Sequence, residues 1–60
     1  MPSDETRRVL KVFGVAVTSL EDAIDSQASP EEIMKWDREV TERTREILAL
    51  VDRVRSRRIA

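Results

Sequence analysis

The chain of 60 residues lacks cysteine and histidine, and it contains one tryptophan, one phenylalanine and one glycine. Without cysteine it has no disulfide, no thiolate nucleophile and no sulfur-ligated zinc site, and without histidine it lacks the commonest general base and metal ligand. A single glycine excludes a glycine-rich phosphate loop, and two aromatic residues provide no base-stacking surface. We therefore expect no enzymatic activity, no cofactor and no small-molecule substrate.

Long apolar runs are also missing from the sequence. Residues 12–17 form the longest apolar stretch, interrupted by one glycine, whereas a membrane-spanning helix needs about 20 apolar residues. Arg7 and Arg8 precede an apolar segment, as in a twin-arginine export signal, but two acidic residues stand before them and Lys11 interrupts the segment. We therefore expect a soluble, cytoplasmic protein with no membrane partner.

Two groups of residues are typical of helix starts. Ser3 is a good N-cap, and the two acidic residues after it suit the positive end of a helix dipole. Ser29, Pro30 and Glu32 have the types and spacing of a capping box with proline at the first helical position. The pattern predicts one domain over residues 1–60, with a helix over about 4–26, a turn over about 27–29 and a helix over about 30–58.

The width of the apolar stripe on each predicted helix indicates the architecture. At 100° per residue, the apolar side chains of either helix span an arc of about 160°. Such an arc is wider than the seam of a two-stranded coiled coil and suits a helix with two neighbours. We therefore expect an all-α antiparallel helical hairpin that assembles as a homodimeric four-helix bundle. The residues predicted for the core and the oligomer interface are Leu10, Phe13, Val17, Leu20, Ile24, Trp36, Val40, Ile47, Val51 and Val54.

Two single residues in the helices each allow two interpretations. Trp36 falls within the apolar arc, where it packs against Leu20 and Ile24 or forms a hot spot for a protein partner. Gly14 lies in mid-helix at a cost of about 1 kcal/mol relative to alanine. This glycine either permits the close approach of another helix or is a neutral substitution.

Charge is nearly balanced in number, with 11 basic and 12 acidic side chains, but it is unevenly placed. An antiparallel hairpin gathers at its open end the basic residues Arg7, Arg8, Lys11, Arg53, Arg55, Arg57 and Arg58. It gathers at its turn the acidic residues Glu21, Asp22, Asp25, Glu31 and Glu32. Three interpretations stay open: solvated surfaces, complementary ends of an antiparallel dimer, or arginines that bind an anionic partner such as nucleic acid.

Two known proteins offer resemblances. The plan of a short helical hairpin resembles the plasmid repressor-of-primer protein, whose dimeric bundle binds paired RNA loops. The small subunit of exonuclease VII is similar in the spacing of residues in both helices, namely Phe13, Ala16, Leu20, Glu21 and Ile24 in the first, and Pro30, Glu31, Glu32 and Val40 in the second. These resemblances imply an accessory protein that acts close to nucleic acid.

The residues themselves favour a function in protein–protein interaction. We expect a small adaptor, regulator or accessory subunit whose partner is a second copy of the chain or another helical protein. The alternative is a nucleic-acid-associated accessory protein that uses its arginine-rich end, although the net charge of -1 weakens this interpretation.

Overall fold

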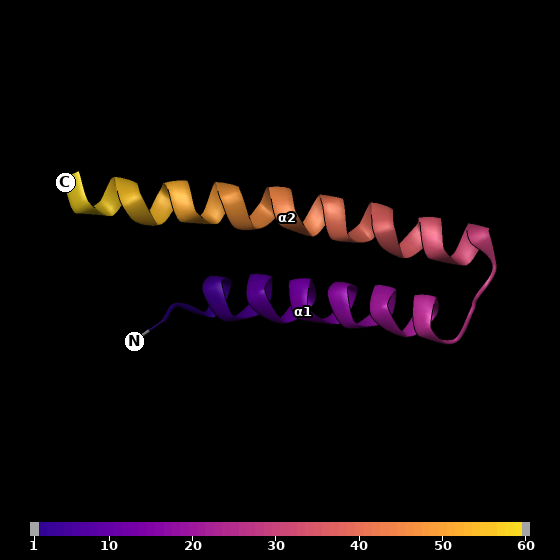
Figure 1. Cartoon of the computed structure of the whole chain (residues 1–60). Helices are drawn as coiled ribbons and strands as arrows, with labels where there is room; N and C mark the ends of the chain where they lie inside the picture. The colour runs from indigo at the N-terminus through magenta and orange to yellow at the C-terminus, as the bar shows by residue number, and fades with distance from the viewer. Residues whose placement is uncertain (1, 60) are drawn as a thin grey trace.

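The computed structural model describes residues 2–59 and contains two α-helices that pack against each other in antiparallel directions (Figure 1). Helix α1 spans Asp4–Asp25 and helix α2 spans Pro30–Ile59. The prediction of an all-helical hairpin is confirmed. The first helix ends one residue earlier and the second one residue later than the predicted ranges.

Serine caps the N-terminus of both helices. The backbone N–H of Thr6 donates to Ser3 Oγ over 3.1 Å, and that of Glu32 donates to Ser29 Oγ over 3.2 Å. The predicted capping box is half formed, because the Glu32 carboxylate does not turn back to the cap. Its Oε1 instead accepts a hydrogen bond of 3.1 Å from the indole Nε1–H of Trp36, one turn into α2.

The turn between the helices is a Schellman motif. The backbone N–H of Ala28 donates to the carbonyl of Ala23 (2.9 Å), and the N–H of Gln27 donates to the carbonyl of Ile24 (3.1 Å). Gln27 adopts a φ of 57°, in the left-handed region where glycine is the usual residue. Helix α1 therefore ends in a conformation for which glycine is the usual residue, but glutamine occupies this position.

The contact between the helices buries two small side chains of α1 and one leucine of α2. Ala16 and Ala23, seven residues apart on α1, are buried, and so is Leu50 of α2. An ion pair of 3.3 Å between Glu5 and Arg53 joins the two helices near the open end. The larger apolar side chains of α1 are half-buried or exposed.

The hairpin is a single layer, with principal extents of 48 × 18 × 12 Å. With 30 residues against 22, α2 is the longer helix and extends past the start of α1 (Figure 1). A Cβ placed on Gly14 meets no atom within 4 Å, so α2 does not make the close approach that a mid-helix glycine could permit. Neither helix of the described residues has the length and apolar character of a membrane span.

Candidate docking face

One side of the hairpin carries a row of apolar side chains that the second helix leaves uncovered. Leu10, Val17 and Ile24, each seven residues from the next on α1, remain 52%, 39% and 53% exposed. Phe13 and Leu20 lie between this row and the contact line and are half-buried. Together these five residues form an apolar strip along nearly the whole of α1.

Helix α2 contributes a matching strip. Ile33, Val40, Ile47 and Val51 are half-buried, and Val54 near the open end is exposed. Residues three, four and seven positions apart share one side of a helix, so these five side chains follow a continuous line. We call the strips on α1 and α2, taken together, the apolar face.

The opposite side of the hairpin holds a groove that both charged and apolar residues line. Its lining includes Val12 of α1 and Glu46 and Arg53 of α2. Leu10 precedes Val12 by two residues and Val51 precedes Arg53 by two, which places them on nearly opposite sides of their helices. The apolar face and this groove therefore lie on opposite sides of the hairpin, and we call the groove side, with its ion pairs, the charged side.

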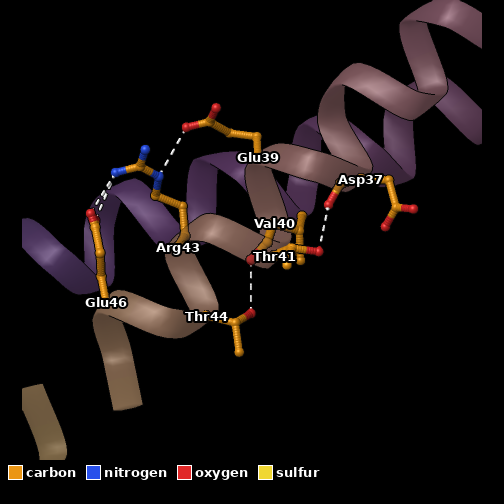
Figure 2. A network of polar contacts seen from close by, with 7 residues as sticks. All are labelled: Asp37, Glu39, Val40, Thr41, Arg43, Thr44 and Glu46. Atoms are coloured by element: carbon orange, nitrogen blue, oxygen red, sulfur yellow. Dashed lines mark hydrogen bonds and ion pairs between the residues drawn. The ribbon is translucent and has the colours of Figure 1, made fainter. Parts of the chain in front are cut away.

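Arg43 organises the charged side (Figure 2). Its Nη1 donates to both carboxylate oxygens of Glu46, at 2.7 and 2.6 Å, and its Nε lies 2.9 Å from Glu39 Oε1. The Nε–H is not aimed along that line, so Glu39 contributes an ion pair rather than a hydrogen bond. Because the Arg43 side chain is only 27% exposed, these two carboxylates compensate its partial removal from water.

Threonines near the apolar face bond to their own helix. The Thr44 hydroxyl donates to the Val40 carbonyl (2.8 Å), and the Thr41 hydroxyl donates to the Asp37 carbonyl (3.1 Å) (Figure 2). Each donor is therefore satisfied within α2. A partner can cover these side chains without leaving an unpaired hydroxyl proton.

The ten residues predicted for the core and interface divide into two groups. Leu10, Val17, Ile24 and Val54 are exposed and the other six are half-buried. Ala16, Ala23 and Leu50, the buried residues of the described part of the chain, were not among the ten, although all three belong to the apolar arcs. At 100° per residue, Leu50 lies at one edge of the α2 arc and Ala23 lies near one edge of the α1 arc, so periodicity does not single these residues out.

Trp36 lies away from the exposed row of the apolar face. It lines a shallow groove beside the turn together with Ala23 and Ala28, and its ring centroid lies 4.9 Å from Lys35 Nζ. Leu20 and Ile24, the neighbours expected from the sequence, do not line this groove. The hydrogen bond from Nε1 to Glu32 fixes the polar edge of the indole on its own helix.

The antiparallel course brings all seven predicted basic residues to the open end, where all are exposed. They do not share one surface. Arg53 pairs with Glu5 on the groove side, whereas Arg55 lies two positions further and pairs with Asp52 over 3.6 Å. Phosphate binding depends on several cations on one face, and here they are distributed around the ends of both helices.

The remaining chemistry of the described residues is limited. Between residues 2 and 59 no group of three acidic, histidine or cysteine side chains is placed to hold a metal ion. Comparisons of the chain with protein-family models, with curated proteins and with solved structures find no match. The similarity to the exonuclease VII small subunit therefore rests only on the spacing of the residues that suggested it.

Proposed function

We propose that the chain is a non-enzymatic, cytoplasmic protein–protein interaction module whose apolar face pairs with a second copy to form a homodimeric four-helix bundle. In this assembly the protein acts as a small adaptor, regulator or accessory subunit. The exposed row Leu10, Val17 and Ile24 carries the proposal, because one hairpin has no means of covering it.

The exposed area of the hairpin supports association. A compact monomer of 6.9 kDa has an accessible surface of about 4000 Å² by the usual scaling with mass, whereas this chain exposes 4937 Å². The excess of about 900 Å² is close to the roughly 800 Å² that each partner contributes to a stable interface. A second copy is the simplest occupant, since closed two-fold pairs are the commonest protein assemblies.

Two exposed valines provide a matched test of the apolar face. Val17 lies in the exposed row and Val15 lies two positions away, on the other side of α1, with 53% exposure against 39%. We expect Val17→Asp to raise the dimer dissociation constant at least a hundredfold, because two carboxylates then enter the interface, and Val15→Asp to leave it nearly unchanged. Sedimentation equilibrium measures both constants, and circular dichroism confirms that each variant stays helical.

The outcomes separate the proposed dimer from other assemblies. A helical wild-type chain that is monomeric at every concentration contradicts the homodimer. Equal weakening by both substitutions places the interface elsewhere. Recovery of a larger assembly from cells, with the purified chain monomeric, replaces the second copy with a different helical protein.

The alternative, binding of nucleic acid by the open end, depends on Arg57 and Arg58. Both lie in the last turns of α2, and among residues 2–59 neither takes part in an ion pair, unlike Arg53 and Arg55. Titration with RNA and DNA over a series of salt concentrations tests this alternative. Binding whose logarithm falls linearly with that of the salt concentration, and which Arg57→Ala with Arg58→Ala abolishes, favours it.

A further inference from the structure

Charged residues along the two edges of the apolar face are sorted by sign. Each of them lies three or four residues from an apolar-face residue on its own helix, and all are exposed. Near the turn the edges carry Glu21 of α1 and Asp37 of α2. Near the open end they carry Arg7 of α1 and, on α2, Arg55 and Arg58. The apolar face is therefore bounded by negative charge at one end and positive charge at the other.

Two copies that stack their apolar faces with parallel axes can close about either of two two-fold axes. An axis along the hairpin brings the two open ends together and lays α1 over α2 of the second copy. An axis across the hairpin lays the open end of one copy over the turn of the other. In that second case α1 lies over α1 and α2 over α2, each pair running antiparallel.

The charged edges distinguish these arrangements. With open ends together, Arg7 approaches Arg55 and Arg58 of the second copy, and Glu21 approaches Asp37. Like charges then meet at both ends of the interface. With the open end over the turn, Arg7 approaches the second copy's Glu21, and Arg55 approaches its Asp37. Opposite charges then meet at every corner.

The geometry points to an antiparallel homodimer, in which the basic open end of each hairpin lies over the acidic turn of the other. This inference rests on the proposed function. Charge pairing of this kind sets the orientation of the two copies more than it sets their affinity, which the apolar face supplies.

Ion pairs within the hairpin leave the edge charges available to a second copy. Arg55 lies 3.6 Å from Asp52, but their side chains are 77% and 78% exposed, and such a pair contributes little. Glu5 is engaged with Arg53 on the groove side and does not neutralise the edge. The net positive charge at the open end therefore persists at the boundary of the apolar face.

Spin labels on single introduced cysteines test the orientation directly, because the chain has none of its own. Ser56 marks the open end and Ser26 marks the turn, and both are exposed. At 1.5 Å per residue, two Ser56→Cys labels in an antiparallel dimer lie roughly 30–35 Å apart along the bundle. A label on Ser56→Cys of one copy and one on Ser26→Cys of the other lie within roughly 20–25 Å, about the thickness of a bundle.

Charge reversal is a second test, because it changes the dissociation constant of the dimer in opposite directions in the two arrangements. We expect Arg55→Glu with Arg58→Glu to weaken the antiparallel dimer about three- to tenfold, and added Asp37→Arg to restore it. With open ends together, the same reversal relieves repulsion from Arg7 and tightens the dimer. Arg38→Glu, an exposed reversal away from the apolar face, is the control and leaves the dissociation constant unchanged.

Failure of the inference and failure of the proposed function give different results. A monomer in sedimentation contradicts the proposed dimer itself. A dimer in which the two Ser56 labels lie close together, or which the arginine reversal tightens, contradicts the antiparallel orientation. Either result is compatible with the proposed function. Three results support the inference. The two Ser56 labels lie far apart, the Ser56 label of one copy lies close to the Ser26 label of the other, and Asp37→Arg restores the affinity of the dimer.

Discussion

Substitutions at two leucines, one buried in the hairpin and one half exposed, distinguish the stability of the hairpin from the strength of its association. Leu50 is 4% exposed within the hairpin, and Leu10 is 52% exposed. Replacing a buried leucine by alanine costs 2–5 kcal/mol, since both the burial and the packing around the cavity are lost. We expect Leu50→Ala to lower the free energy of unfolding by about 3 kcal/mol at every protein concentration.

Leu10→Ala is expected to respond to concentration. Full burial of a leucine side chain contributes about 2–3 kcal/mol, and the hairpin alone realises about half of it, so the substitution costs about 1 kcal/mol in a monomer. The other half is realised when a second hairpin covers the apolar face. The cost per chain therefore rises to about 2–3 kcal/mol under conditions where the wild-type chain is dimeric.

Urea denaturation over about a hundredfold range of protein concentration measures these costs, with Trp36 fluorescence and helical circular dichroism as two probes. Met34→Ala is the control for an exposed side chain away from the apolar face. The reasoning is refuted if the wild-type midpoint is independent of concentration and Leu10→Ala costs the same throughout.

Three further substitutions test local features of the hairpin by the same denaturation measurement. Gln27→Gly is expected to raise the free energy of unfolding by about 1 kcal/mol, because glycine adopts the φ of 57° without strain, and Gln27→Ala gives no such gain. Ser29→Ala is expected to cost about 1 kcal/mol, because the Glu32 N–H loses its acceptor, while Ser29→Asp retains the cap. Gly14→Ala is expected to stabilise α1 by up to about 1 kcal/mol, since the added Cβ meets no atom within 4 Å. If the variant instead loses stability at high protein concentration, a second hairpin packs against Gly14.

The helices and their capping residues follow from local chemistry, which is why the sequence predicts them closely. Ser3 and Ser29 need only their own neighbours to act as caps, and no residue between them opposes a helix before the turn. The Schellman turn was harder to predict. Its key position holds glutamine rather than glycine, so the strongest sequence signal for that geometry is absent at Gln27.

The partition of the apolar residues could not be predicted from periodicity alone. The arc of about 160° identifies the apolar side of each helix. It does not show which of these side chains contact the other helix and which stay exposed. The rotation of each helix about its axis in the hairpin makes that choice. It buries Ala16 and Ala23 of α1 and Leu50 of α2 and leaves Leu10, Val17 and Ile24 exposed. The hydrogen bond between Glu32 and the Trp36 indole was not predicted, because the capping-box pattern assigned the Glu32 carboxylate to the cap.

The same packing explains why the hairpin leaves part of its apolar surface uncovered. In a lone hairpin each helix has one neighbour, and its apolar arc is wider than one neighbour covers. Leu10, Val17 and Ile24 therefore stand at the edge of the layer, on the side away from Arg43 and its two carboxylates. The charged side disfavours an apolar partner because covering it would desolvate that ion-pair network. The apolar face is therefore the side that the proposed dimer buries, and its two copies close about a two-fold axis.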